Sequence, residues 1–184
     1  MTDTHEKSSS KGHLATGQHI SGRFNEELEG IKSMLLEMGG KVEQQIDLTA
    51  QALADGESEA ADAVIVIDRE INQLEVEIDE QCARIIALRQ PAAFDLRLVM
   101  SIAKLSTDLE RIGDEATRVA KIANTSLSNR PLAVSASHII GVANEVSGML
   151  RQALDAFARL DAETAIAVVL WDRDANGDFN AGMA

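Results

Sequence analysis

The sequence predicts an all-α protein, built as an antiparallel three-helix bundle followed by an incomplete second three-helix repeat. Three observations predict this fold. Apolar residues recur every three or four positions through most of the chain, as they do on the buried face of a helix. Only two prolines, Pro91 and Pro131, interrupt the 184 residues. Aromatic residues make up 3% of the chain, so Ala, Leu, Ile and Val must fill the core, which suits closely packed helices.

The chain begins with a polar stretch, and the first helical pattern follows it. Residues 1–17 are rich in Ser, Thr and Gly, and we expect a disordered tail there. The helix should start near His19 or Phe24. Gly39 and Gly40 lie inside it, at a cost of about 1 kcal/mol per Gly relative to Ala, and either the close approach of another helix or a local kink would explain them. The apolar positions of this pattern are Phe24, Leu28, Ile31, Leu35, Met38, Val42 and Ile46.

Two further helices complete the first bundle. The turn "ADGES" at 54–58 separates the first helix from the second. The second helix should end before Pro91, because proline disfavours helical backbone at the residue that precedes it. Asp95 is the expected N-cap of the third helix, which fades at "NTSLSNRP", residues 124–131. Short turns between helices of this length predict an up-down-up bundle over residues 18–126.

The second half of the chain repeats the first after a shift of 104 residues, without a gap. The stretch "ALADGESEAADAVIVIDREIN", residues 52–72, aligns with "AFARLDAETAIAVVLWDRDAN", residues 156–176. Helix one should therefore correspond to helix four, and helix two to helix five. The second repeat, residues 127–184, lacks a third helix, and its last stretch "NGDFNAGMA" is a poor helix former. We expect helix four and only the start of helix five there, as in a longer protein that has been cut short.

Charge and composition narrow the class of protein. The net charge of −13 disfavours nucleic-acid binding, which needs a basic face, and favours cations or basic protein surfaces as partners. Cys82 is the single cysteine, and we expect it to be a small core residue in a reducing compartment. The start of the chain has no apolar signal region, and the longest apolar run, Ala165 to Trp171, is too short to span a bilayer. A cytoplasmic location without direct membrane insertion is therefore expected.

The stretch "DLERIGDEATRVAK" carries the candidate site. Glu110 and Asp114 lie one turn apart on a single helix face, so their carboxylates could share a hard cation. The alternative is an ordinary charged surface, in which Arg111 and Arg118 neutralise Asp114 at a few tenths of a kcal/mol each, about the value for exposed pairs. Acids four residues apart are also common by chance in a chain with 30 acidic residues.

Neighbouring helices can supply further ligands. The turn near residue 92 places Asp68, Glu70 and Glu75 level with Glu110 and Asp114 in an antiparallel pair. The turn near residue 56 similarly brings Glu37, Glu43 and Gln44 of the first helix to that height. All these ligands are oxygen atoms, so Mg²⁺, Mn²⁺ or Fe fits better than Zn²⁺. The four histidines are scattered along the chain: His5, His13, His19 and His138.

Four stretches resemble the PhoU family: "HISGRFNEELE", "EMGGKVEQQI", "RIIALRQPAAFDLRLVMSIAKLSTDLERIGDEA" and "QALDAFARLDAETA". The resemblance covers about residues 18–176. It implies two three-helix bundles related by an internal repeat, in a cytoplasmic and often homodimeric protein. It also implies an acidic E-x-x-x-D motif, associated with metal binding, on the third helix of each repeat. Glu110 and Asp114 match the first such motif, and the second is absent together with its helix.

The resemblance implies a non-enzymatic role. Family members regulate phosphate uptake and couple the phosphate ABC transporter to a sensor histidine kinase, keeping the starvation response off when phosphate is plentiful. We therefore expect a negative regulator and adaptor with no catalytic residues. Two alternatives stay open. One is a carboxylate-bridged di-metal enzyme, although the chain has no Glu-x-x-His motif of the di-iron kind, and the other is a non-functional truncated remnant.

Overall fold

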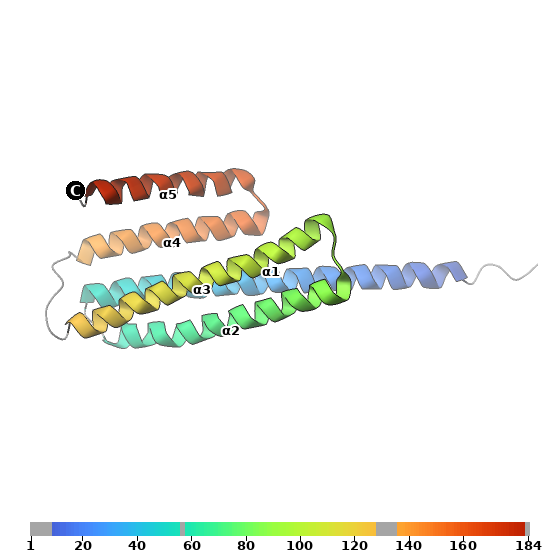
Figure 1. Cartoon of the computed structure of the whole chain (residues 1–184), viewed down its shortest axis with the longest axis horizontal. Helices are drawn as coiled ribbons and strands as arrows, with labels where there is room; N and C mark the ends of the chain where they lie inside the picture. Colours follow the sequence, from blue (N-terminus) through green and yellow to red (C-terminus); the bar gives the residue numbers. More distant parts are fainter. Residues whose placement is uncertain (1–8, 56–57, 128–135, 183–184) are drawn as a thin grey trace, which may run out of the picture.

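A computed structural model describes residues 9–55, 58–127 and 136–182, and these residues form five helices with no strand (Figure 1). The all-α fold that the sequence predicts is confirmed. In this part of the chain, no helix is long and apolar enough to cross a bilayer. The helices are α1 (Ser9–Asp55), α2 (Ser58–Arg89), α3 (Ala93–Leu127), α4 (Ala136–Arg159) and α5 (Ala162–Gly182).

Helices α1, α2 and α3 pack against one another as the predicted three-helix bundle. The three-four pattern fills its core, because each helix turns an apolar stripe inward. Cys82 is buried in this core as predicted, with its Sγ 3.7 Å from the carbonyl oxygen of Val99. Burial, with a smaller contribution from the charge of Asp79, raises the pKa of the Cys82 thiol to about 11. The largest fully buried apolar side chains are Ile31, Leu35, Met38, Val42, Val64, Ile71, Ile78, Ile85, Val99 and Ile102.

Helix α4 covers the face of α1 that the bundle leaves open, and α5 lies beyond it (Figure 1). Within the described ranges, α5 packs on α4 and on no other helix. Gly39 is buried where the Leu154 side chain of α4 comes against α1, whereas Gly40 has nothing within 4 Å of the position a Cβ would take. Close helix approach therefore explains Gly39.

The start of α1 differs from the expectation. The helix begins at Ser9, so residues 9–17 are helical although we expected a disordered tail and a start near His19. No proline lies between Ser9 and Phe24, and glycines lower helix stability without ending a helix. Residues 1–8 of the expected tail lie outside the described residues.

Other helix ends test the remaining predictions. Helix α2 ends at Arg89, before Pro91, as expected. Helix α3 begins at Ala93, so Asp95 lies in its first turn and is not its N-cap. A carboxylate in the first turn still interacts favourably with the positive end of the helix dipole. Helix α5 continues to Gly182, through the stretch expected to be poor helix. Helix α3 continues to Leu127, into the predicted linker 124–131, and residues 128–131 of that linker lie outside the described residues.

The helix boundaries follow the 104-residue repeat. Helix α4 ends at Arg159, and 159 minus 104 is 55, the last residue of α1. Helix α5 begins at Ala162, and 162 minus 104 is 58, the first residue of α2. The helices on either side of the second turn thus end and begin at positions equivalent to those around the first, as a tandem repeat requires.

Candidate functional site

The antiparallel pairing of α2 and α3 brings four carboxylates together. Glu110 is half-buried on α3, and Asp114 is exposed one turn further on. Asp68 and Glu75 are half-buried on α2. Burial raises the pKa of Glu110, and the negative charges of Asp114, Glu75 and Asp68 and a hydrogen bond with Asp114 raise it further. All four predicted site residues therefore lie within electrostatic reach of one another.

The ion pairs that the structure shows among the described side chains leave this group out. None of the ion pairs among the described side chains involves Asp68, Glu75, Glu110 or Asp114. The alternative prediction, in which arginines of α3 pair with Asp114, is not what the structure shows. Arg111 lies 3.6 Å from Asp108 and Arg118 lies 3.2 Å from Glu115.

Neutral donors hold the two α2 carboxylates instead. The Oδ1 atom of Asp68 accepts hydrogen bonds from the Thr117 hydroxyl at 2.9 Å and from Gln45 Nε2 at 3.4 Å. Glu75 accepts one from the Thr107 hydroxyl at 3.2 Å. These donors fix the carboxylates without cancelling their charge, so the cluster keeps a negative potential.

Several acids expected at the same height lie elsewhere. Glu70 pairs with Lys41 at 2.7 Å, and Glu37 lies 4.0 Å from the same lysine. Glu43 pairs with Arg151 of α4 at 2.7 Å. Gln44 is exposed. The prediction that these residues join the site is therefore wrong for the three acids, because each lies beside a cation and none is among the charges that act on Glu110.

Sequence reasoning missed the buried polar residue beneath the cluster. Gln45 of α1 is fully buried, and its Nε2 donates to the Thr117 hydroxyl at 2.8 Å and to the Val64 carbonyl oxygen at 3.3 Å. Its Oε1 has no hydrogen-bond partner among the described residues. Gly113 makes room for it, because a Cβ at Gly113 would lie 2.8 Å from that Oε1. A glutamine next to Ile46, on the core face of the first helix, was the available signal.

The donor set fits one type of cation better than others. Among the described residues, no group of three or more His, Cys, Asp or Glu side chains has the geometry to hold a metal ion. An enclosed structural site of the zinc type does not fit, since it needs four converging ligands. A hydrated hard cation does fit, because Mg²⁺ is commonly held by one or two carboxylates and keeps several waters. Glu110 and Asp114 would be its direct ligands.

Comparison with known sequences shows that the chain is similar to PhoU proteins. Residues 35–123, which include all four site carboxylates, match the PhoU domain. A Pseudomonas aeruginosa protein named "Phosphate-specific transport system accessory protein PhoU homolog" is 45% identical over 165 residues, covering 90% of this chain and 68% of that protein. The Escherichia coli K12 protein named "Phosphate-specific transport system accessory protein PhoU" is 42% identical over 168 residues, again covering 90% and 68%.

Solved structures give the same result. The crystal structure of PhoU from Pseudomonas aeruginosa superposes with a TM-score of 0.82 at 44% sequence identity, over 87% of this chain and 77% of that one. The phosphate transport system regulatory protein PhoU from Streptococcus pneumoniae superposes with a TM-score of 0.77 at 32% identity, over 86% and 74%.

Proposed function

Because the chain belongs to the PhoU family, we propose that it is a negative regulator of phosphate uptake and phosphate-starvation signalling, acting as a metal-binding adaptor. Its relatives are named accessory proteins of the phosphate-specific transport system, and one solved relative is named a regulatory protein of phosphate transport. Those names support a regulatory role and no catalytic one. The adaptor would work in the cytoplasm and bind the transporter at the inner face of the membrane.

The group of unneutralised carboxylates around Glu110 carries the metal part of this proposal. A half-buried carboxylate with a raised pKa, facing three other acids, is electrostatically unfavourable when ionised. A divalent or trivalent cation such as Mn²⁺, Mg²⁺ or Fe would remove that cost. Glu110 and Asp114 would bind it directly, and Asp68 and Glu75 would bind it through water. The cation would then hold α2 and α3 together and change the charge of their outer surface.

The same charge suggests the partners. With a net charge of −13, the helical surface is suited to basic patches on other proteins, and opposite charge speeds their encounter. A sensor histidine kinase and the ATPase of a phosphate ABC transporter are the proposed partners, with self-association into a homodimer. A di-metal enzyme is disfavoured, because a bridged pair of ions needs more converging ligands than the described residues supply.

A complementation experiment tests this function. The chain would be expressed in bacteria that lack their own PhoU protein and carry a reporter of the phosphate-starvation response. In high phosphate, the parent chain should repress the reporter, and the double variant Glu110→Gln/Asp114→Asn should not. The matched control is Asp108→Asn/Glu115→Gln, which changes two other acids of α3 that pair with arginines.

Repression by the control but not by the site variant would support the proposal. Equal repression by both variants would refute the role of the carboxylate site. Failure of the parent chain to repress at all, although it accumulates as folded protein, would refute the regulatory function.

A further inference from the structure

Two buried polar side chains, Gln45 of α1 and Thr117 of α3, connect the core of the bundle to the carboxylate cluster. Gln45 is fully buried, and Thr117 is 3% exposed. Gln45 Nε2 donates to the Thr117 hydroxyl oxygen at 2.8 Å, and that hydroxyl donates to Asp68 Oδ1 at 2.9 Å. Gln45 Nε2 also reaches Asp68 Oδ1 directly, at 3.4 Å. Asp68, on α2, is therefore held by donors from both other helices of the bundle.

The acceptors fix the direction of these hydrogen bonds. The Val64 carbonyl oxygen lies 3.3 Å from Gln45 Nε2 and can only accept a hydrogen bond. The amide nitrogen of Gln45 must therefore face this side, since a flipped amide would set two acceptors against each other. The Thr117 hydroxyl has one proton to donate, and Asp68 receives it. Both hydrogen bonds to Asp68 among the described residues end on Oδ1, so they do not occupy Oδ2.

The position of Gln45 carries a cost that packing does not explain. Its Oε1 is buried without a hydrogen-bond partner among the described residues, and such an oxygen lowers stability. Gly113 accommodates it, because a Cβ at Gly113 would lie 2.8 Å from this Oε1. The 104-residue repeat sets Met149 of α4 at the equivalent position, since 149 minus 104 is 45, so the repeated helix does not require a glutamine there. A buried residue that lowers stability and that the fold does not require indicates a functional role.

We propose that Gln45 and Thr117 are positioning residues of the cation site. They hold Asp68 in place from the core side, so that its carboxylate can contact the water shell of a cation bound by Glu110 and Asp114. Partners of this kind orient the ligands of metal sites and raise their affinity. This role rests on the metal binding proposed above, and it adds α1 to a site otherwise built from α2 and α3 alone.

Mn²⁺ titration of the purified full chain, followed by electron paramagnetic resonance, tests this role. Gln45→Met should weaken Mn²⁺ binding about tenfold, the lower end of the loss that follows when partners of metal ligands are removed. Thr117→Val should do the same, because valine has nearly the shape of threonine without its hydroxyl. Thr117→Ser keeps the hydroxyl and should bind Mn²⁺ like the parent.

Thermal unfolding without added metal separates positioning from a purely structural role. Gln45→Met removes the unpartnered Oε1 and fills the core position with an apolar side chain, so its melting temperature should equal or exceed that of the parent. A glutamine with a purely structural role would show the reverse, a lower melting temperature with unchanged Mn²⁺ affinity, and that result would overturn the proposal. If Gln45→Met does not fold, the comparison of Thr117→Val with Thr117→Ser decides.

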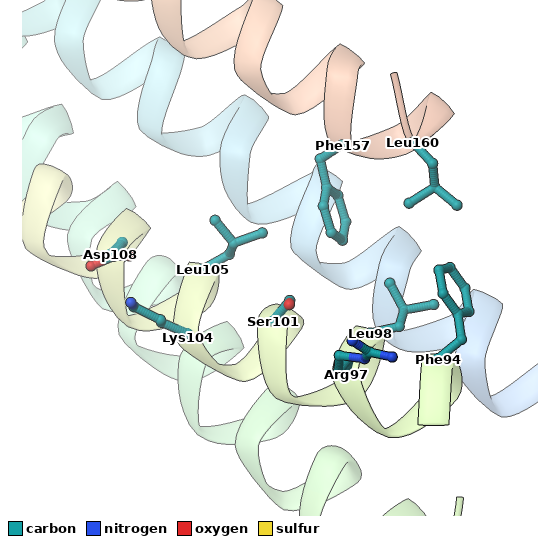
Figure 2. Close-up of a pocket in the computed structure, with 9 residues that line it drawn as sticks. All are labelled: Phe94, Arg97, Leu98, Ser101, Lys104, Leu105, Asp108, Phe157 and Leu160. Atoms are coloured by element: carbon teal, nitrogen blue, oxygen red, sulfur yellow. The ribbon is translucent and has the colours of Figure 1, made fainter. Parts of the chain in front are cut away.

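Two control variants remove a hydroxyl elsewhere. Thr49 is buried on α1 one turn after Gln45, and its hydroxyl lies 2.8 Å from the carbonyl oxygen of Gln45 and 3.3 Å from that of Ala116. Thr49→Val should lower stability without changing Mn²⁺ affinity. Ser101 of α3 lines an open groove near the end of α4 (Figure 2), and Ser101→Ala should change neither. A loss of Mn²⁺ affinity in Thr49→Val as large as that in Thr117→Val would show a general effect of packing and refute positioning.

A double-mutant cycle with Asp68 shows whether Gln45 acts through it. Gln45→Met should weaken Mn²⁺ binding in the parent but not in the Asp68→Ala background. Equal losses in both backgrounds would refute the proposal. Equal Mn²⁺ affinity of the parent, Gln45→Met and Thr117→Val would refute it too, while leaving the proposed cation site intact. Absence of saturable Mn²⁺ binding by the parent would refute the cation site itself, and the positioning role with it.

Discussion

Two adjacent glycines of α1, Gly39 and Gly40, allow a test of how closely the hairpin of α4 and α5 packs on α1. Replacing Gly39 or Gly40 by Ala adds the same methyl group one residue apart. In an open helix position, the change stabilises a protein by about 0.5–1 kcal/mol, because alanine restricts the unfolded chain and favours the helix. Gly40 has open space at the Cβ position, so Gly40→Ala should show that gain.

Gly39→Ala should have the opposite effect. Its new methyl group would overlap the Leu154 side chain, whose Cγ would lie only 3.3 Å away. Excess volume in a packed interface costs about 1–3 kcal/mol, which offsets the helix gain. We therefore expect the free energy of unfolding of Gly39→Ala to lie about 1–3 kcal/mol below that of Gly40→Ala.

Urea denaturation followed by circular dichroism measures the difference between the two variants. Hydrogen exchange locates it, because the lost protection should concentrate in α4 and α5 while the core of α2 and α3 keeps its protection. Equal stability of the two variants, or a loss spread evenly over all five helices, would refute the close packing of α4 on α1.

Three further predictions follow from the same structure. The free energy of unfolding of Glu110→Gln should equal that of the parent near pH 4 and exceed it at neutral pH. The pKa of Glu110 is raised in the folded protein, so the parent loses stability as the pH rises above 4.5, the usual pKa of a glutamate. Denaturant titrations without added metal measure this, and lower stability of the variant at neutral pH would contradict it. The Cys82 thiol, with a pKa of about 11, should react with a thiol reagent only at the rate of unfolding, so rapid labelling of the native protein would show that it is accessible. Limited proteolysis should cut first within residues 127–184, because α5 packs on α4 alone among the described helices. Mass spectrometry should then find a resistant fragment that ends near residues 124–131. Equal resistance along the whole chain would contradict this.

The sequence anticipated the height of the site but not its full composition. Counting residues from the turn near position 92 correctly placed Asp68 and Glu75 beside Glu110, because two antiparallel helices keep a fixed register. The same counting failed for Glu37, Glu43 and Glu70, since it gives the height of a residue and not the side of the helix on which it lies. Lys41 and Arg151 decide that side, and their partners depend on how the helices rotate against one another.

The role of the buried polar residues could not be predicted from the apolar pattern, for a different reason. Gln45 occupies a core position, and apolar periodicity treats a polar residue there as an interruption. Its role becomes apparent only when Thr117 and Asp68, far away in the sequence, are seen to share its side chain. The length of α1 could not be predicted because no proline or cap marks its start, and helix ends without such signals are poorly defined by sequence.

The binding of Mn²⁺ to the purified chain tests the central claim most directly. Electron paramagnetic resonance would follow free Mn²⁺ during titration of the parent, of Glu110→Gln/Asp114→Asn, and of the control Asp108→Asn/Glu115→Gln. We predict saturable binding by the parent and the control, and loss of that binding in the site variant with its helical circular dichroism unchanged. Equal Mn²⁺ binding by all three proteins would contradict it, as would the absence of saturable binding by the parent.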